Sequence, residues 1–278
     1  MSTRCRALLA VCLAGLLPLS THGWGASGHR LITSKAVETL PPELRGFFEA
    51  SRNELALHCT EPLDWLAKNP STEKANQYIF LDKYGNFPFE TLPRDYKAAV
   101  RKHTLRVVRS NGVLPWNVGV YSEKLTKAFK AGDWEEARKM AAYLAFYVAE
   151  AHDPFSTTEN NDGQQSRQNG VNKRFGTNLV DRFAPFFFVR PNDAVYIDDP
   201  TDHAFEMCLS SHSWLENILL SDRRAKHPVR GYNDEYYERF YNQAGAILIR
   251  EVSDAATDVG SYWLTAWINA GRPPLPTR

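Results

Sequence analysis

The chain has 278 residues, 43% of them hydrophobic and 12% aromatic, and its 33 basic and 32 acidic residues give a formal net charge of +1. This length and composition can bury one sizeable hydrophobic core. A charge so close to zero gives no electrostatic reason to expect binding to nucleic acid or to an anionic membrane surface.

The first 23 residues have the pattern of a secretory signal peptide. Arg4 and Arg6 provide the positive region, an apolar run covers residues 7–19, and Thr21 and Gly23 are small residues at the −3 and −1 positions of a cleavage site. A transmembrane anchor is the weaker alternative because about 20 apolar residues are needed to span a bilayer. We therefore expect cleavage before Trp24, a secreted or periplasmic protein, and a single domain over residues 24–278.

Apolar residues recur at helical spacing through most of the chain. Helices are predicted at about 27–39, 43–58, 94–110, 118–130, 133–152, 202–220 and 233–269. The helix at 133–152 has Asp133 and Glu136 in capping-box positions and ends before Pro154. The last helix is expected to bend or break between Ser253 and Gly260. The sequence predicts an all-α fold.

Only two short segments have strand character, residues 78–81 and 186–196. Two polar loops, residues 69–89 and 157–172, are long enough to be either disordered or functional. The phenylalanine-rich tract at 183–189 is more typical of a core or an interface than of a ligand site. Cys59 and Cys208 remain after cleavage, and either a disulfide or two buried free thiols fits the sequence.

Three motifs occur in order behind the signal peptide. They are WGASGH at 24–29, EPLDWLAKNPSTEKANQYIFLDKYG at 61–85, and YVAEAHDPFSTTENNDGQ at 147–164 followed by QNGVNKRF at 168–175. Together they resemble the superfamily of zinc-dependent phospholipases C and single-strand-specific nucleases, in particular its bacterial secreted members. The resemblance implies an all-helical fold of that type around three zinc ions that hydrolyse phosphate esters.

The resemblance places the first ion on the amino nitrogen and carbonyl oxygen of Trp24, on His29 and on Glu150. Glu150 replaces an aspartate and retains the carboxylate. These nitrogen and oxygen donors favour zinc over calcium, and Asp64 can approach the same ion. One zinc ion is therefore the cofactor that the chain can still hold, and a three-zinc cluster is not expected.

The other two ions lose most of their ligands. The second ion would share Glu150 and use the residues at Asp64, Gln77 and Phe146. Phenylalanine has no donor atom, and a glutamine oxygen is a poor substitute for imidazole on zinc. The third ion would use the positions now occupied by Ser156, Asn172 and Gly176, which offer two weak neutral donors and no side chain.

Simpler roles stay open for the remaining candidates. His29 can be an ordinary partly buried histidine, Glu150 can pair with an arginine or lysine, and Asp64 can cap a helix. His152 and Asp153 are neighbours whose side chains diverge on a helix, which favours structural roles for both. The sequence assigns no residue a catalytic role.

The sequence thus indicates a secreted protein similar to phospholipase C or nuclease whose catalytic metal site is degenerate. It would be a pseudoenzyme or a weakened phosphoester hydrolase, with a phosphate ester or phospholipid head group as ligand. The alternative is an active phosphodiesterase with a single metal on Trp24, His29, Asp64 and Glu150. A third possibility is an interaction module that retains only the fold.

Overall fold

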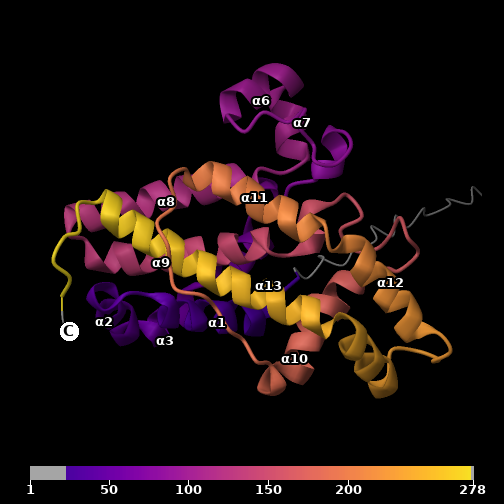
Figure 1. The fold of residues 1–278 in the computed structure, drawn as a ribbon. Helices are drawn as coiled ribbons and strands as arrows, with labels where there is room; N and C mark the ends of the chain where they lie inside the picture. Colours follow the sequence, from indigo (N-terminus) through magenta and orange to yellow (C-terminus); the bar gives the residue numbers. More distant parts are fainter. Residues whose placement is uncertain (1–22, 277–278) are drawn as a thin grey trace, which may run out of the picture.

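The computed structural model describes residues 23–276, and it is helical throughout, with no β-strand among these residues (Figure 1). This confirms the predicted all-α class. Residues 1–22, which make up nearly all of the predicted signal peptide, lie outside the described residues. None of the described helices is both long enough and apolar enough to cross a membrane.

The helices follow one another closely along the chain. The α-helices are α1 (Gly25–Ala36), α2 (Pro42–Ala50), α3 (Arg52–His58), α4 (Glu61–Lys68), α5 (Pro70–Glu73), α6 (Tyr96–His103), α7 (Leu105–Ser110), α8 (Leu114–Ala131), α9 (Trp134–Ala151), α10 (Leu179–Phe183), α11 (Pro200–His212), α12 (Leu215–Lys226) and α13 (Asp234–Asn269). Single turns of other helix types are η1 (Val37–Thr39), η2 (Lys74–Gln77), η3 (Leu81–Tyr84), η4 (Pro154–Thr157), η5 (Lys173–Asn178) and η6 (Ala184–Phe186).

Helix α9 is the central element. Asp133 caps its start by accepting a hydrogen bond from the backbone N–H of Glu136 at 3.1 Å, as the capping pattern predicts. From Met140 to Ala151 every residue is buried, and many are alanines that let neighbouring helices approach closely. Helices α1, α3, α8 and α13 pack against it (Figure 1). The end of α9 is therefore surrounded by other helices.

Three of the predicted helices are each interrupted by a turn. The predicted helix at 43–58 is divided at Ser51, the one at 94–110 at Thr104, and the one at 202–220 at Ser213 and Trp214. The positive φ of Thr104, 70°, takes its backbone out of the helical region, and the Thr104 hydroxyl then caps α7 by accepting from the N–H of Val107. Apolar spacing continues across these turns, so it does not reveal them.

Helix α13 is the reverse case, because it continues without a break where an interruption was expected. Ser253, Thr257 and Ser261 donate hydrogen bonds to the backbone carbonyls four residues earlier, at 2.7–3.0 Å. Polar residues of this kind are satisfied within the helix and do not interrupt it. The expectation was a bend or a break between Ser253 and Gly260, and a break is excluded because α13 is one helix from Asp234 to Asn269.

The strand candidate at 186–196 is not a strand, although its backbone is largely extended. Four hydroxyls, one on each successive turn of α13, accept hydrogen bonds from backbone N–H groups of residues 190–197. This hydroxyl row pairs Ser253 with Arg190, Thr257 with Asn192, Ser261 with Val195 and Thr265 with Ile197, at 2.9–3.1 Å. The extended segment runs past α13 (Figure 1) and finds its partners on a helix instead of on a second strand.

The second strand candidate, residues 78–81, is a connection between helices. The N–H of Ile79 donates to the carbonyl of Ser156 at 2.8 Å, and the N–H of Phe80 donates to the carbonyl of Asn111 at 2.7 Å. These bonds join it to two different loops, so no ladder forms.

The phenylalanine-rich tract divides between core and surface. Phe183 and Phe187 stack on Tyr241 of α13, with ring centroids 4.3 Å and 6.0 Å away. Phe186 and Phe188 point outward, with 75% and 64% of their surfaces exposed. The tract therefore anchors the loop and also presents two exposed aromatic rings.

Candidate functional site

Trp24 connects the start of α1 to the end of α9. The residue is buried, and its indole nitrogen donates to the carbonyl of Ala149 at 2.7 Å. Gly25 follows with φ of 58°, a backbone conformation that glycine adopts readily, and the helix then begins. The indole of Trp24, the residue predicted at the mature N-terminus, is thus bonded to the residue that precedes Glu150.

His29 and Glu150 are in direct contact beneath this junction. The Nε2 atom of His29 lies 3.1 Å from an oxygen of Glu150, and neither side chain is exposed to solvent. The ring of Phe146 stacks on the imidazole, with centroids 4.3 Å apart and planes 22° apart. Histidine and not lysine or arginine is therefore the partner of Glu150, and Phe146 fills the space beside it.

Ser156, from the turn η4, lies between two buried carboxyl groups. Its Oγ atom is 2.9 Å from Glu150 and 3.1 Å from Asp153. A hydroxyl has one proton, so it can donate to only one of the two. Burial, and then the negative charge of Glu150, raise the pKa of Asp153 to about 8. A protonated Asp153 can donate to Ser156, which in turn donates to Glu150.

The other positions named by the resemblance lie apart from this contact or contribute no charge. Asp64 is exposed on α4, and Thr60 takes the cap position of that helix. Gln77 is buried and donates to the carbonyl of Pro62 and to Glu73, at 3.0 Å and 2.9 Å. Asn172 is buried, and its side-chain oxygen has no hydrogen-bond partner among residues 23–276. A β-carbon on Gly176 would lie 1.8 Å from the carbonyl oxygen of Gly23, so a side chain has no room there.

The residues present do not fit a preformed zinc centre. Within residues 23–276 no group of three or more His, Cys, Asp or Glu side chains is arranged to hold a metal ion. His29 and Glu150 supply two donors, Ser156 is neutral, and the Trp24 nitrogen is part of a peptide bond. A structural zinc site needs four ligands, and a catalytic one needs three plus an open position.

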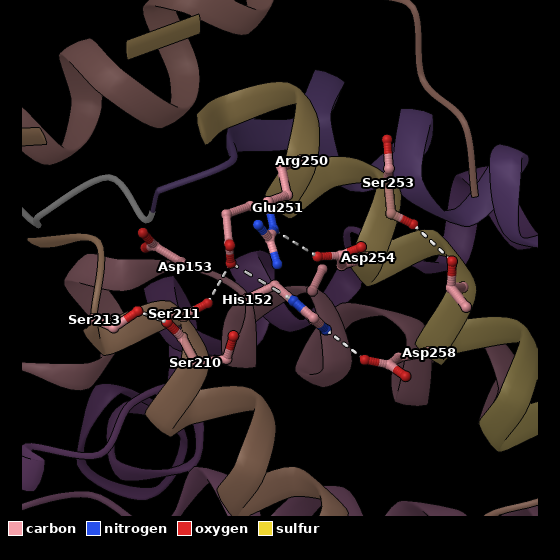
Figure 2. Close-up of polar contacts among 12 residues, drawn as sticks. His152, Asp153, Ser210, Ser211, Ser213, Arg250, Glu251, Ser253, Asp254 and Asp258 are labelled. Atoms are coloured by element: carbon pink, nitrogen blue, oxygen red, sulfur yellow. Dashed lines mark hydrogen bonds and ion pairs between the residues drawn. The ribbon is translucent and has the colours of Figure 1, made fainter. Parts of the chain in front are cut away.

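A second buried polar cluster surrounds His152 at the same helix end (Figure 2). The Nε2 atom of His152 is 2.8 Å from Asp258, and its Nδ1 atom is 3.7 Å from Glu251. The other oxygen of Asp258 contacts His203 at 2.9 Å, and Glu251 also accepts a hydrogen bond from Ser211 at 2.5 Å. These residues lie at the end of α9 and on α11 and α13. Their ion pairs and hydrogen bonds therefore link the three helices.

The charge states in this cluster follow from its contacts. Burial alone would lower the pKa of His152, but its contacts with Asp258 and Glu251 outweigh burial and raise this pKa to about 10. Burial would raise the pKa of Asp258, whereas its two histidine partners lower it to about 2. His152 is therefore a buried imidazolium at neutral pH.

The sequence predicts a structural role for His152 but does not reveal its partners. The available signal was on α13, where Glu251, Asp254 and Asp258 follow at i, i+3 and i+7 and so share one helix face. An acidic residue such as Glu251 among the buried positions of this helix indicates a buried cation opposite it. Which residue supplies that cation depends on tertiary packing.

The two polar loops predicted from the sequence meet at a pocket of about 520 Å³. Asp82 and Phe87 line it from the first loop, and Thr158, Asn160 and Gln165 line it from the second. Asp82 holds the loops together, since it accepts hydrogen bonds from Thr158 and from the N–H of Glu159 at 2.6–3.1 Å. Among residues 23–276 no lysine or arginine lines this pocket, so its charge does not favour a phosphate group.

No protein-family model matches the chain, and no curated protein matches it with significance.

Proposed function

We propose that this is an exported protein of the zinc-dependent phospholipase C and single-strand nuclease type that has lost catalysis, or keeps it only weakly. It holds at most one zinc ion, and its ligand is a phosphate ester or a phospholipid head group. The observation that supports this best is the direct contact of His29 with Glu150 under the ring of Phe146. His29, Glu150 and Phe146 occupy positions that match metal ligands of the family, and in this protein their side chains contact one another.

The family relationship has its own support. Trp24, His29 and Glu150 are far apart in sequence and lie together at the end of α9. An all-helical chain with this grouping agrees with the ligand set that the resemblance implies for its first ion. This grouping is the structural feature that supports the proposed relationship.

Loss of catalysis follows from the chemistry of the remaining groups. Phosphoester hydrolysis by paired metals needs two ions a few ångströms apart, which stabilise the attacking and leaving oxygens and generate hydroxide. Phe146 is buried where one ligand of the second ion would stand, and Gln77 is occupied by two hydrogen bonds. Neither position can hold a second ion next to Glu150.

One observation favours the alternative, an active phosphodiesterase with a single metal. Two ligands about 2.0 Å from a tetrahedral zinc ion lie roughly 3.3 Å apart, close to the 3.1 Å between His29 and Glu150. The Nδ1 atom of His29 is also buried and has no hydrogen-bond partner within the described part of the chain. The exposed position of Asp64 weighs against this function, because it leaves the ion without the expected third side chain.

Zinc content and turnover test the proposal together. The chain beginning at Trp24 would be dialysed against a metal buffer, analysed for zinc, and assayed with bis(p-nitrophenyl) phosphate. We expect at most one zinc per chain, lost in His29→Gln and kept in the control His227→Gln, and no turnover above that of His29→Gln. Three zinc ions per chain, or turnover that His29→Gln abolishes, would contradict loss of catalysis.

Restoring ligands gives a second test. The double substitution Phe146→His with Gln77→His returns two imidazoles to ligand positions, and we expect it to raise the zinc content by about one ion. Gly176 is left unchanged because the backbone of Gly23 occupies the space of its side chain. A folded double variant with unchanged zinc content would count against the relationship to this family.

A further inference from the structure

The pocket between the two polar loops is a preformed cavity that the proposed function does not use. Its volume of about 520 Å³ is typical of small-molecule sites. Asp82 fixes the two loops by accepting hydrogen bonds from Thr158 and from the N–H of Glu159, and an ion pair of 2.9 Å joins Lys83 to Glu159 at the same junction. Among residues 23–276, those that line the pocket include no position that the resemblance assigns to a metal ion.

His212 lines the pocket and has one ring nitrogen that can accept a hydrogen bond from a ligand. The hydroxyl of Thr157 donates its single proton to the carbonyl of Pro154 at 2.6 Å, so it accepts from Nδ1 of His212 at 3.0 Å. Burial lowers the pKa of His212 below its ordinary value of 6.5, although the negative charge of Asp82 opposes this change, so the imidazole is neutral at pH 7. Its Nε2 atom therefore carries a lone pair, and no hydrogen bond joins Nε2 to another of residues 23–276.

The other polar groups of the lining leave negative charge and acceptors for a ligand. Asp82 and Glu216 are the charged residues of the lining within the described chain, and both are acidic. Each hydroxyl and amide side chain of the lining already donates a proton within the protein. These donors and their acceptors, 2.6–3.2 Å apart, are Thr158 to Asp82, Ser213 to the carbonyl of Ser210, Asn160 to Ser166, and Gln165 to Glu159. A complementary ligand therefore supplies hydrogen-bond donors and positive charge.

One wall of the pocket is apolar. Phe87 lines it with 60% of its surface exposed, and Leu215 and Leu219 of α12 belong to the same lining and are buried. An exposed aromatic ring in a cavity with acidic side chains can pack against an apolar group or contact a cation through its face. The wall therefore suits a ligand that has an apolar body beside its charged group.

We propose that this pocket binds an organic amine in its ammonium form, with N–H groups directed to His212 and Glu216 and with its apolar part against Phe87. An ammonium group has donors and no acceptor, which matches a neutral imidazole nitrogen and a carboxylate. An alcohol of the same shape has one donor and no charge, and a carboxylate would be repelled by Glu216. The inference goes beyond the proposed function, because it involves neither a metal ion nor a phosphate ester.

Three small molecules that share a phenyl ring and differ in their polar group test the ligand class. Phenethylamine, phenethyl alcohol and phenylacetate would each be titrated into the purified protein by isothermal calorimetry at pH 7. We expect saturable binding of one phenethylamine per chain, at least about tenfold tighter than that of the alcohol. Phenylacetate should not bind. Equal affinities for the amine and the alcohol, binding of phenylacetate, or no saturation by phenethylamine at about 10 mM would overturn the proposal.

Matched variants locate the binding. Glu216→Gln should weaken phenethylamine binding by roughly fivefold and leave the alcohol unaffected. The control is Glu235→Gln, because Glu235 is also an exposed glutamate in the first turn of a helix but does not line the pocket. Unchanged affinity for phenethylamine in Glu216→Gln, or the same loss in Glu235→Gln, would contradict the assignment.

The ring nitrogens of His212 give a measurement that needs no substitution. In nitrogen NMR spectra of the natural protein, the proton of this imidazole should be on Nδ1, and phenethylamine should shift the Nε2 resonance. His212→Phe identifies the resonance and retains a ring beside Phe89, whose ring centroid lies 4.9 Å from that of His212. A proton on Nε2, or an Nε2 resonance that does not change at saturation, would overturn the role of His212.

Discussion

His152 shows how a single charged residue can stabilise contacts among three helices. Its imidazolium lies between Asp258 and Glu251 of α13, and Asp258 reaches on to His203 of α11. Removing one member of a buried pair leaves the other charge without a partner, which costs about 3–5 kcal/mol. His152→Gln should therefore be among the most destabilising single substitutions at the end of α9.

The same pair makes stability depend on pH in a defined direction. The folded pKa of His152, about 10, lies above its ordinary value of 6.5, so its contribution is complete below pH 6.5 and is lost as the pH rises toward 10. Asp258 has a lowered pKa of about 2, so its contribution is present above pH 3.8 and is lost as the pH falls toward 2.

Urea unfolding at a series of pH values measures this effect. Between pH 7 and pH 9 the natural protein should lose about 1.4 kcal/mol per pH unit more than His152→Gln does. Parallel pH profiles for the two proteins would show that His152 is not protonated in the folded state.

At the scale of residues, the sequence predicts a site residue only where its partners are near in sequence or where the family resemblance names it. It drew attention to Trp24, His29 and Glu150, which lie together, but it could not show that Asp64 points to solvent. The partners of His152 come from α13, about 100 residues later. Contacts across that separation depend on how helices pack, and the spacing of residues along one helix does not contain that information.

At the scale of elements, the close approach of α13 to the end of α1 depends on Gly260. A β-carbon at this position would lie 1.9 Å from the hydroxyl oxygen of Thr39 and 3.1 Å from the carbonyl of Ala36. These atoms belong to a buried turn and cannot move aside freely. The contact explains why a residue that is unfavourable inside helices occurs in the middle of α13.

Gly260→Ala should destabilise the protein by about 2 kcal/mol through overpacking. The matched control is Gly46→Ala in α2, where a β-carbon would meet nothing within 4 Å. That change should stabilise the protein by about 0.5–1 kcal/mol, since alanine is the better helix former. The urea midpoints of the two variants should move in opposite directions, and a shift in the same direction would contradict the packing argument.

If the hydroxyl row holds the 190–197 segment against α13, removing one hydroxyl should loosen that segment. Ser261→Ala removes the acceptor of the Val195 N–H and should cost about 1–2 kcal/mol. Hydrogen exchange at the Val195 amide should become faster, while exchange in α9 is retarded as before. Ser213→Ala is the control, because this exposed hydroxyl bonds only to the Ser210 carbonyl of its own turn. Unchanged exchange at Val195 would show that the hydroxyl row does not hold the segment.

The helices were the most predictable elements, and their ends the least. The Asp133 cap was visible because its partner lies three residues away. The turn at Thr104 has no glycine or proline to mark it, and the extended 190–197 segment looks like a strand because only α13 supplies its acceptors. Local sequence patterns therefore predict where the helices lie, whereas tertiary contacts determine the residues at which they end.

At the scale of the whole molecule, the buried cysteines show how fully the centre is closed to solvent. Cys59 and Cys208 are free and buried, so the structure has the two-thiol alternative and not the disulfide. Burial raises the pKa of the Cys59 thiol to about 11 and raises that of Cys208 still further. Neither thiol should react as a thiolate at neutral pH.

Ellman's reagent tests this on the chain from Trp24. We expect no reactive thiol in the folded protein, two after unfolding in urea, and the same Tm with and without a reducing agent. A chain that gains thiols only after reduction would instead contain the disulfide.

The backbone contacts of the 190–197 segment have a consequence for how its sequence can vary. The α13 hydroxyls bind main-chain N–H groups, so they recognise an extended peptide whatever its side chains. Proline is the exception, and Pro191 stands between two donor residues, at a position where no donor is needed. A library randomised over this connection should accept most amino acids at Asp193, yet reject proline at Arg190, Asn192 and Val195.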